Sequence, residues 1–324
     1  MTSRVNITII GLGRVGISMG LALKRAEGVE LVITGHDKEP KRTRLALQRK
    51  AIDKGEWNLP RSVEKADLVI LALPLSAIRE TLEYIAEDLR PNAVVTDTAA
   101  LKVPVLRWAQ ELLPEHVHFI GGHPIVRDVI PDPEAAHAEV FKGEIYCLST
   151  TPSARPEAVK LITNMIKLLE AQPLFIDPQE HDALIAGVEQ APQVLAIVLT
   201  HAVTQSSGWR DMRKLAGAQL EASTFITNPD PADLALQLQA NREHLMSWLD
   251  LLERYLAHWR RLIEEGPPEK VEEALDALQS ARKAWIEAAL KGKWEEEGDV
   301  EKAFSLRDWL FGQSFTRRWR EQRK

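Results

Sequence analysis

The stretch VNITIIGLGRVGISMG, residues 5–20, decides the fold of this chain. Its first half is apolar and β-branched, as in a strand buried on both faces, and at Gly11 it gives way to small residues typical of a helix. Gly11, Gly13 and Gly16 fit the G-x-G-x-x-G turn between such a strand and such a helix. The first glycine permits the tight turn, the second lets backbone N–H groups approach a pyrophosphate, and the third lets the helix lie close to the strand. The pattern predicts a dinucleotide site at the helix N-terminus.

A second strand and an acidic residue follow at the expected spacing. Residues 30–35, ELVITG, are typical of a strand, and Asp37 lies near the position of the carboxylate that binds a ribose 2′-OH in such folds. A carboxylate there repels the 2′-phosphate of NADP, so we expect NAD as the cofactor. Four basic residues between positions 38 and 44 keep NADP open as an alternative. Asp37 has a second interpretation, as a cap for the helix that starts near Pro40.

The rest of the chain alternates strands with helices and then becomes helical. Predicted strands cover residues 67–74, 93–97, 116–120, 144–150 and 173–177, and predicted helices between them cover 41–50, 76–89, 101–113 and 157–170. The predicted helices after residue 179 are 182–206, 232–264 and 270–291. We predict an α/β Rossmann-type doubly wound sheet (residues 1–177) followed by an all-helical dimerisation and substrate domain (residues 178–324).

Ligands of a doubly wound sheet bind where the carboxyl ends of the strands meet. One predicted strand ends at Leu73 and Pro74, the next ends at Asp97, and a third ends in Gly-Gly-His-Pro at residues 121–124. The residues expected to bind the cofactor are Gly11, Leu12, Gly13, Arg14, Val15, Gly16, Asp37, Leu73, Pro74 and Asp97.

The composition is that of an ordinary globular protein and excludes several classes. The 324 residues are 45% hydrophobic and 27% charged, and the net charge of −6 argues against a nucleic-acid partner. The single cysteine, Cys147, excludes a disulfide framework and a cysteine-rich metal site, so we expect a cytoplasmic protein without a metal. The first strand begins close to Met1, so we expect no leader, and we expect that no apolar run reaches the ~18 residues of a membrane span.

Aromatic residues are concentrated in the helical part. Seven of the nine tryptophans lie at or beyond Trp209. Trp248 and Trp259 have the spacing of one helix face and fit a helical core as well as an interface. Trp294, Trp309 and Trp319, in or near a basic tail, are candidates for contacts between subunits. We expect a homodimer through the helical domain, since its helices carry more apolar surface than one short bundle can bury.

The chain resembles the prephenate/arogenate dehydrogenase family. The resemblance rests on the glycine turn, the segment at Asp97, the Gly-Gly-His-Pro at residues 121–124 and the run DPQEHD at residues 177–182, and it covers about residues 5–262. It implies a Rossmann-type domain with a helical dimerisation domain, and oxidative decarboxylation of prephenate or arogenate on the way to tyrosine.

The resemblance also implies a catalytic role for His123. In that family this histidine accepts a hydrogen bond from the ring hydroxyl of the substrate as hydride leaves the same carbon for the nicotinamide. Histidine suits the step because it takes a proton near neutral pH. The alternative is a structural histidine that is held by the backbone after a Gly-Gly turn.

The chain departs from the family pattern at the expected substrate positions. Ala100 replaces a serine, and Gln190 and Gln193 replace two histidines. Gln219 aligns with an arginine that is suited to hold a carboxylate in bidentate fashion. We expect Lys102, Gln190, Gln193 and Gln219 to face the substrate.

These departures leave three hypotheses open. The first is a dehydrogenase of prephenate or arogenate. The second is a dehydrogenase of the same fold that acts on a different hydroxy acid, because three amides make a more neutral pocket. The third is a dinucleotide-binding regulator without turnover, against which His123 argues, since such a protein needs no base beside the nicotinamide.

Overall fold

The computed structural model describes residues 4–127, 132–151, 154–227 and 230–291. The chain divides into two compact units, residues 1–249 and residues 250–324. The predicted interface residues Trp294, Trp309 and Trp319 lie outside the described residues.

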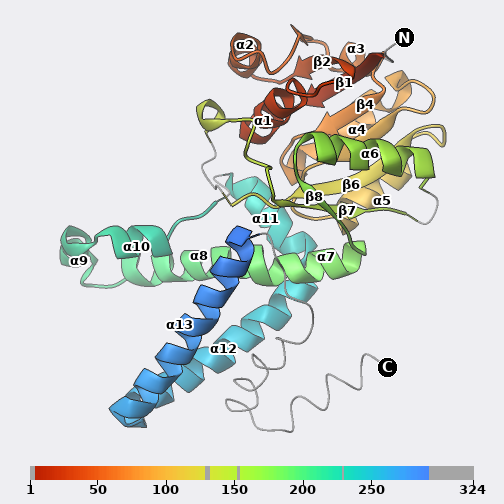
Figure 1. Ribbon diagram of the computed structural model, residues 1–324. Helices are drawn as coiled ribbons and strands as arrows, with labels where there is room; N and C mark the ends of the chain where they lie inside the picture. The colour runs from red at the N-terminus through yellow and green to blue at the C-terminus, as the bar shows by residue number, and fades with distance from the viewer. Residues whose placement is uncertain (1–3, 128–131, 152–153, 228–229, 292–324) are drawn as a thin grey trace, which may run out of the picture. The chain divides into compact units, whose positions relative to one another are not determined.

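The described residues of the first unit form an eight-stranded sheet (Figure 1). Its strands are β1 (Arg4–Ile10), β2 (Glu30–His36), β3 (Lys54–Gly55), β4 (Leu68–Leu71), β5 (Val94–Asp97), β6 (His118–Pro124), β7 (Ile145–Ser149) and β8 (Gln172–Phe175). Their order is β3-β2-β1-β4-β5-β6-β7-β8, and all neighbours are parallel except β6 and β7. The predicted fold class is confirmed. The antiparallel pair, β3 and the helix α3 were not predicted from the sequence.

Helices cover both faces of the sheet (Figure 1). They are α1 (Arg14–Leu23), α2 (Pro40–Gln48), α3 (Leu59–Val63), α4 (Leu75–Ile85), α5 (Val103–Leu112) and α6 (Pro156–Leu168), with short 3₁₀ turns η1 (Ala86–Asp88) and η2 (Pro133–Ala135). One core packs the sheet against α1 and α6, and the other packs it against α4 and α5.

Strand β4 shows why the central strands are apolar throughout. Successive side chains of a strand point to opposite faces, so Leu68 and Ile70 enter the core beside α1 and α6, whereas Val69 and Leu71 enter the core beside α4 and α5. All four residues are buried. A strand with helices on both faces has no solvated side on which a polar residue is tolerated.

The helical part of the first unit follows directly after β8. It consists of α7 (Pro178–Ile185), a π-helical turn η3 (Ala186–Gln190), α8 (Ala191–Thr204), α9 (Trp209–Leu215), α10 (Ala218–Ser223), α11 (Pro231–Ala240) and the beginning of α12 (Arg242–Glu265). The described part of the second unit holds the remainder of α12 and α13 (Pro268–Lys291).

Most helix boundaries differ from the prediction by a few residues. Two of these differences affect the site, and capping explains the first. Helix α7 begins four residues early because Asp177 accepts hydrogen bonds from the backbone N–H groups of Gln179 (2.8 Å) and Glu180 (3.2 Å). The predicted helix 232–264 breaks at Asn241, whose side chain is buried in hydrogen bonds to other helices. The early start of α7 places His181 within a helix.

The continuous helix Pro178–Thr204 has a mean hydropathy of 1.5 over its most apolar window, of which 33% is buried. By length and composition alone it meets the test for crossing a membrane, so the expectation that no segment reaches this length was wrong. That expectation considered uninterrupted apolar runs, which the polar residues of η3 break. Core helices of globular proteins meet the same test.

A polar contact ties the helical segment to the sheet domain. The Asp233 carboxylate, on α11, accepts a hydrogen bond from the Ser76 backbone N–H (2.7 Å) in the first turn of α4. A carboxylate satisfies the unpaired donors at a helix N-terminus and is favoured by the helix dipole. This contact places α11 directly beside the loop at Leu73 and Pro74.

Candidate functional site

The three glycines of the first turn have different surroundings. Gly11 has a φ of +92°, and a Cβ there would lie 2.2 Å from the carbonyl oxygen of Ala72. A Cβ on Gly16 would lie 2.0 Å from the carbonyl oxygen of Gly11, whereas a Cβ on Gly13 would meet no atom within 4 Å. The fold therefore requires glycine at positions 11 and 16. At position 13 glycine instead leaves open space at the N-terminus of α1, which is the cradle that a pyrophosphate needs.

Asp37 joins the glycine turn to the end of β2. One carboxylate oxygen accepts from the Leu12 N–H (2.7 Å) and the other accepts from the Glu39 N–H (2.8 Å). The Arg42 guanidinium lies 3.9 Å from the first oxygen and makes a closer pair, 2.8 Å, with Glu39. Asp37 therefore both organises the turn and orders the start of α2, so the two interpretations of this residue are compatible.

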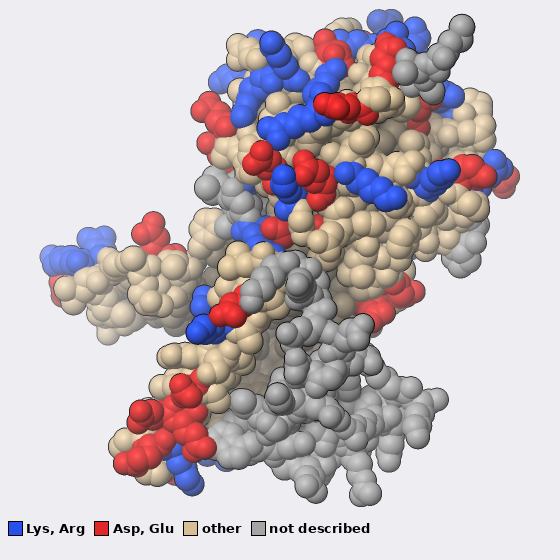
Figure 2. All heavy atoms as spheres, in the orientation of Figure 1, with Lys and Arg blue, Asp and Glu red and all other residues tan. Residues whose placement is uncertain are grey.

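Basic side chains gather over α2 (Figure 2). Of the other residues in the predicted cofactor site, Leu12, Arg14 and Gly16 are buried, Val15 and Leu73 are half-buried, and Pro74 is exposed at the start of α4. Asp97, the last of the residues expected to bind the cofactor, is fully buried.

Asp97 and Lys102 form a buried ion pair at the carboxyl ends of β5 and β6. Both side chains are 0% exposed. The Lys102 ammonium also donates to the Gly122 carbonyl (2.5 Å), and Asp97 accepts from the backbone N–H groups of Gly122 and Ala99, each at 3.0 Å. These contacts fix the backbone immediately before His123. As folded, the Lys102 ammonium faces Asp97 and no open pocket.

His123 is the first member of a buried chain of hydrogen bonds. Its Nδ1 lies 3.1 Å from Nε2 of His181, and Nδ1 of His181 lies 2.8 Å from the Asp182 carboxylate. Asp182 in turn accepts from the backbone N–H groups of Lys102 (2.7 Å) and Val103 (2.9 Å). The three side chains come from β6 and α7, and they are almost completely buried.

The direction of this chain determines which nitrogen of His123 carries a proton. The Asp182 carboxylate only accepts, so Nδ1 of His181 must donate to it, which leaves a lone pair on Nε2 of His181. That lone pair accepts from Nδ1–H of His123, so Nε2 of His123 is left with a free lone pair. A neutral imidazole with this tautomer is a base at Nε2.

Electrostatics keep His123 neutral. Burial lowers its pKa well below the usual 6.5, and the neighbouring His181 and Lys102 side chains lower it further. At neutral pH His123 is therefore an unprotonated base. The Glu189 carboxylate, in the turn η3, lies 3.6 Å from Nε2, and burial raises the pKa of Glu189 to about 7.

The glutamines expected at the substrate differ in their surroundings. Gln190 is buried, and its amide accepts from Asn241 (2.8 Å) and donates to the Gln237 carbonyl (3.0 Å). Gln193 is also buried, but its side-chain oxygen has no hydrogen-bond partner among the described residues. Gln219 is exposed on α10.

The structure thus brings Asp97, Lys102 and His123 together, and Gln219 is not among them. Sequence reasoning gave no role to His181, Asp182 or Glu189. The adjacent His-Asp pair was a usable signal, whereas the position of Glu189 depends on a π-helical turn that no sequence pattern indicated. Among the described residues, no group of three or more His, Cys, Asp or Glu is placed to hold a metal ion.

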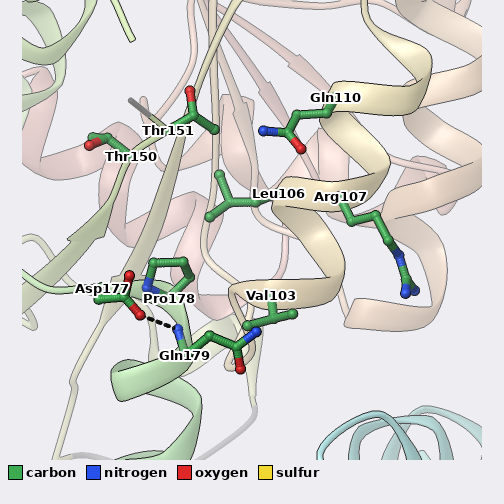
Figure 3. Close-up of a pocket in the computed structure, with 9 residues that line it drawn as sticks. All are labelled: Val103, Leu106, Arg107, Gln110, Thr150, Thr151, Asp177, Pro178 and Gln179. Atoms are coloured by element: carbon green, nitrogen blue, oxygen red, sulfur yellow. Dashed lines mark hydrogen bonds between the residues drawn. The ribbon is translucent and has the colours of Figure 1, made fainter. Parts of the chain in front are cut away.

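A separate groove of about 460 Å³ lies behind the site, between α5, the end of β7 and the start of α7 (Figure 3). Leu106 points toward the strand end, whereas Arg107 points away from it (Figure 3). The groove shares Val103 with the hydrogen-bond chain and contains neither His123 nor the glycine turn. Its lining residues are Val103, Leu106, Arg107, Gln110, Thr150, Thr151, Asp177, Pro178 and Gln179.

These features define a class of protein. The chain is a Rossmann-type dinucleotide-binding protein with a following helical segment, and it carries an oriented histidine base at the ligand-binding edge of its sheet.

Two family models agree with this class. One, described as the nucleotide-binding domain of prephenate dehydrogenase, matches residues 19–174, and the other, described as its dimerization domain, matches residues 177–277. The chain belongs to the prephenate dehydrogenase family, which confirms the resemblance seen in its sequence.

Individual relatives support this assignment. A prephenate dehydrogenase of Lactococcus lactis is 30% identical over 240 residues, which are 69% of this chain and 65% of that protein. One of Bacillus subtilis is 26% identical over 267 residues, 82% of this chain and 72% of that protein. The solved structure of prephenate dehydrogenase from A. aeolicus with hydroxyphenyl propionate and NAD+ is 25% identical, with a TM-score of 0.77 over 88% of this chain and 98% of that chain. The chain thus spans about two thirds of the length of the first of these relatives.

Replacing Lys102 with methionine tests the buried pair. The variant leaves the Asp97 carboxylate buried without its partner, so we expect the free energy of unfolding to fall by about 3–5 kcal/mol. The measurement is urea denaturation followed by circular dichroism. Arg79→Met is the control, because Arg79 makes a half-exposed pair with Glu83 and should cost less than about 1 kcal/mol. If both variants lose the same small amount of unfolding free energy, the buried pair contributes no more to stability than the exposed pair.

Proposed function

We propose that this protein is an NAD-dependent dehydrogenase that oxidatively decarboxylates prephenate or arogenate. The observation that carries the proposal is the free lone pair on Nε2 of buried His123, at the same edge of the sheet as the glycine turn. The family to which the chain belongs and the NAD+ in the A. aeolicus structure support it. An assay of NAD reduction with prephenate, arogenate and a panel of hydroxy acids tests it.

The residues of the first turn fit the cofactor. We propose that Gly13 and the N-terminus of α1 hold the pyrophosphate, that Asp37 faces the ribose, and that Leu73 and Pro74 border the site. NAD, when bound, supplies the acceptor for the hydride that leaves the substrate.

The protein's own residues then handle the proton. His123 accepts the proton of the ring hydroxyl at Nε2, which makes loss of hydride from the same carbon easier. His181 and Asp182 hold the imidazole in the required tautomer, as an orienting carboxylate does in other acid–base sites. The Asp97–Lys102 pair and Gln190 act as positioning residues, because their polar atoms are already engaged within the fold.

Gln193 is the remaining candidate for direct contact with the substrate. Its side-chain oxygen is buried without a partner among the described residues, and buried polar groups normally have one. An amide at this place can accept from a hydroxyl or an ammonium group of a ligand. Activity on another hydroxy acid, with none on prephenate or arogenate, would favour the second hypothesis of a different substrate.

We propose further that the protein works as a cytoplasmic homodimer without a nucleic-acid or membrane partner. The helix Pro178–Thr204 exposes large apolar side chains that a second copy would cover. These are Leu184 (52% exposed), Val188 (69%), Leu195 (48%) and Val198 (57%). The dimerization-domain model covers this helix, and a contiguous exposed apolar face is typical of an interface.

Replacing His123 with alanine should separate chemistry from cofactor binding. We expect the turnover number to fall by ~10²–10⁴, the usual effect of losing a positioned general base, with the Kd for NAD unchanged. Gly13→Val should instead raise the Kd for NAD, because its added atoms fill the open space at the turn. Its thermal stability should be unchanged. Steady-state kinetics and calorimetric titration with NAD measure both. Loss of NAD binding in His123→Ala would instead assign the histidine a structural role.

Cofactor preference depends on the charge of Asp37. We expect NAD to bind at least about tenfold more tightly than NADP, because a carboxylate repels the 2′-phosphate. Asp37→Asn keeps an acceptor for the Leu12 N–H and removes the charge, so it should narrow this ratio. Titration of both variants with both cofactors measures the effect. Equal affinities in the unmodified protein would contradict the prediction.

The dimer is tested at the exposed face of α8. Sedimentation velocity at micromolar concentration should show a species of twice the chain mass, and Val198→Glu should shift it toward monomer because a buried unpaired charge is costly. Tyr84→Glu, on α4, is the matched control at an exposed side chain outside this face. A monomer at all concentrations in the unmodified protein would refute the proposal.

A further inference from the structure

The Glu189 carboxylate lies beside the one atom of His123 that the hydrogen-bond chain leaves free. The distance from its oxygen to Nε2 is 3.6 Å, which is too long for a hydrogen bond to neutral imidazole. The same distance falls within ion-pair range once Nε2 carries a proton. Among the described residues, the Glu189 carboxylate has no other hydrogen bond or ion pair. This geometry leaves Glu189 available to respond to a charge on His123.

The other charged groups near His123 have their own partners. Asp97 is paired with Lys102, and Asp182 accepts from His181 and from two backbone N–H groups. The Cys147 thiol on β7 stays neutral, because burial raises its pKa to about 11. When His123 gains a proton, its own positive charge is therefore the one that lacks a partner among these groups.

The π-helical turn brings Glu189 to this place. One extra residue in the turn advances the helix by about 100° relative to regular α-helix. The Trp248 ring packs against this turn, since a Cβ on Gly187 would lie 2.4 Å from it. Glu189 thus stands on a packed backbone, with its side chain 33% exposed while that of His123 is 8% exposed.

We propose that Glu189 is the counter-ion that stabilises the imidazolium form of His123 during the reaction. The inference rests on the proposed function, and it concerns a residue that acts through His123, not one that contacts the reacting atoms.

The proton balance of the reaction shows when the counter-ion is needed. His123 takes the hydroxyl proton as the C–H electron pair leaves with the hydride, which gives a ring ketone. The bond to the carboxylate then breaks and CO2 leaves, the electron pair of that bond enters the ring, and the ketone oxygen becomes phenolate and recovers the proton from His123. Between these two transfers His123 carries a buried positive charge, and burial makes that charge costly.

The proposal predicts a particular pH dependence. The pKa of Glu189 is raised to about 7, whereas that of His123 is lowered well below 6.5. Above about pH 7 the working form predominates, with Glu189 ionised and His123 neutral. As the pH falls through 7, Glu189 is protonated first and its negative charge is lost. The kcat/KM of the unmodified protein should therefore decline below about pH 7.

Glu189→Gln tests the proposal, since it removes the charge and preserves the shape. We expect kcat/KM at pH 8 to fall roughly 10- to 100-fold, as expected for loss of one charge at about 4 Å. The decline in kcat/KM near pH 7 should disappear, and a decline at lower pH, caused by protonation of His123, should replace it. Compared with Glu189→Gln, Glu189→Asp should keep part of the activity and part of the decline in kcat/KM near pH 7. Glu180→Gln, on an exposed position of α7, is the matched control and should leave both unchanged.

A second readout separates this inference from the proposed function. Nuclear magnetic resonance of ring-labelled histidine in the full chain follows protonation of His123 without any substrate. We expect a step near pH 7 in its resonances in the unmodified protein, caused by Glu189, and no such step in Glu189→Gln. If no substrate is turned over but the step is lost in the variant, the proposed function fails and the coupling stands. Superimposable titrations and pH–rate profiles for the two proteins would overturn the inference.

Discussion

The buried ion pair between Lys102 and Asp97 is the constraint on which the rest of the site depends. Asp97 receives two backbone N–H groups, one of them from Gly122, and Lys102 donates to the carbonyl of the same glycine. The Lys102 backbone N–H also holds Asp182 of α7. One short segment therefore connects β5, β6 and α7. Buried ion pairs often add little net stability, so the more important consequence here is that the relative positions of three elements are fixed.

The fold was largely predictable from the sequence because its signals are local. In β4, four successive apolar residues indicated a strand buried on both faces, and the glycines at positions 11 and 16 are ones that the turn requires. The antiparallel pairing of β7 was not predictable, since strand direction depends on tertiary contacts that leave no periodicity in the sequence. The two-residue strand β3 is too short to carry a pattern.

The site was less predictable than the fold. His123 was predicted from its position after two glycines at a strand end, although Gly121 and Gly122 continue the strand β6 and form no turn. Lys102 was expected to face a substrate, but its partner Asp97 lies on a neighbouring strand end that only the folded chain brings within reach. Glu189 received no role from the sequence. Its proximity to His123 follows from a π-helical turn, and one extra residue in a turn is not visible in hydrophobic spacing.

The direction of the hydrogen bonds explains why the outer nitrogen of His123 is available to a ligand. The orientation of the imidazole comes from its inner nitrogen, through His181 and Asp182. That chain starts at two backbone N–H groups, which hold the Asp182 carboxylate where it accepts from His181. The outer nitrogen then has no structural duty. It is free for a substrate proton, and the group placed beside it needs only to supply charge.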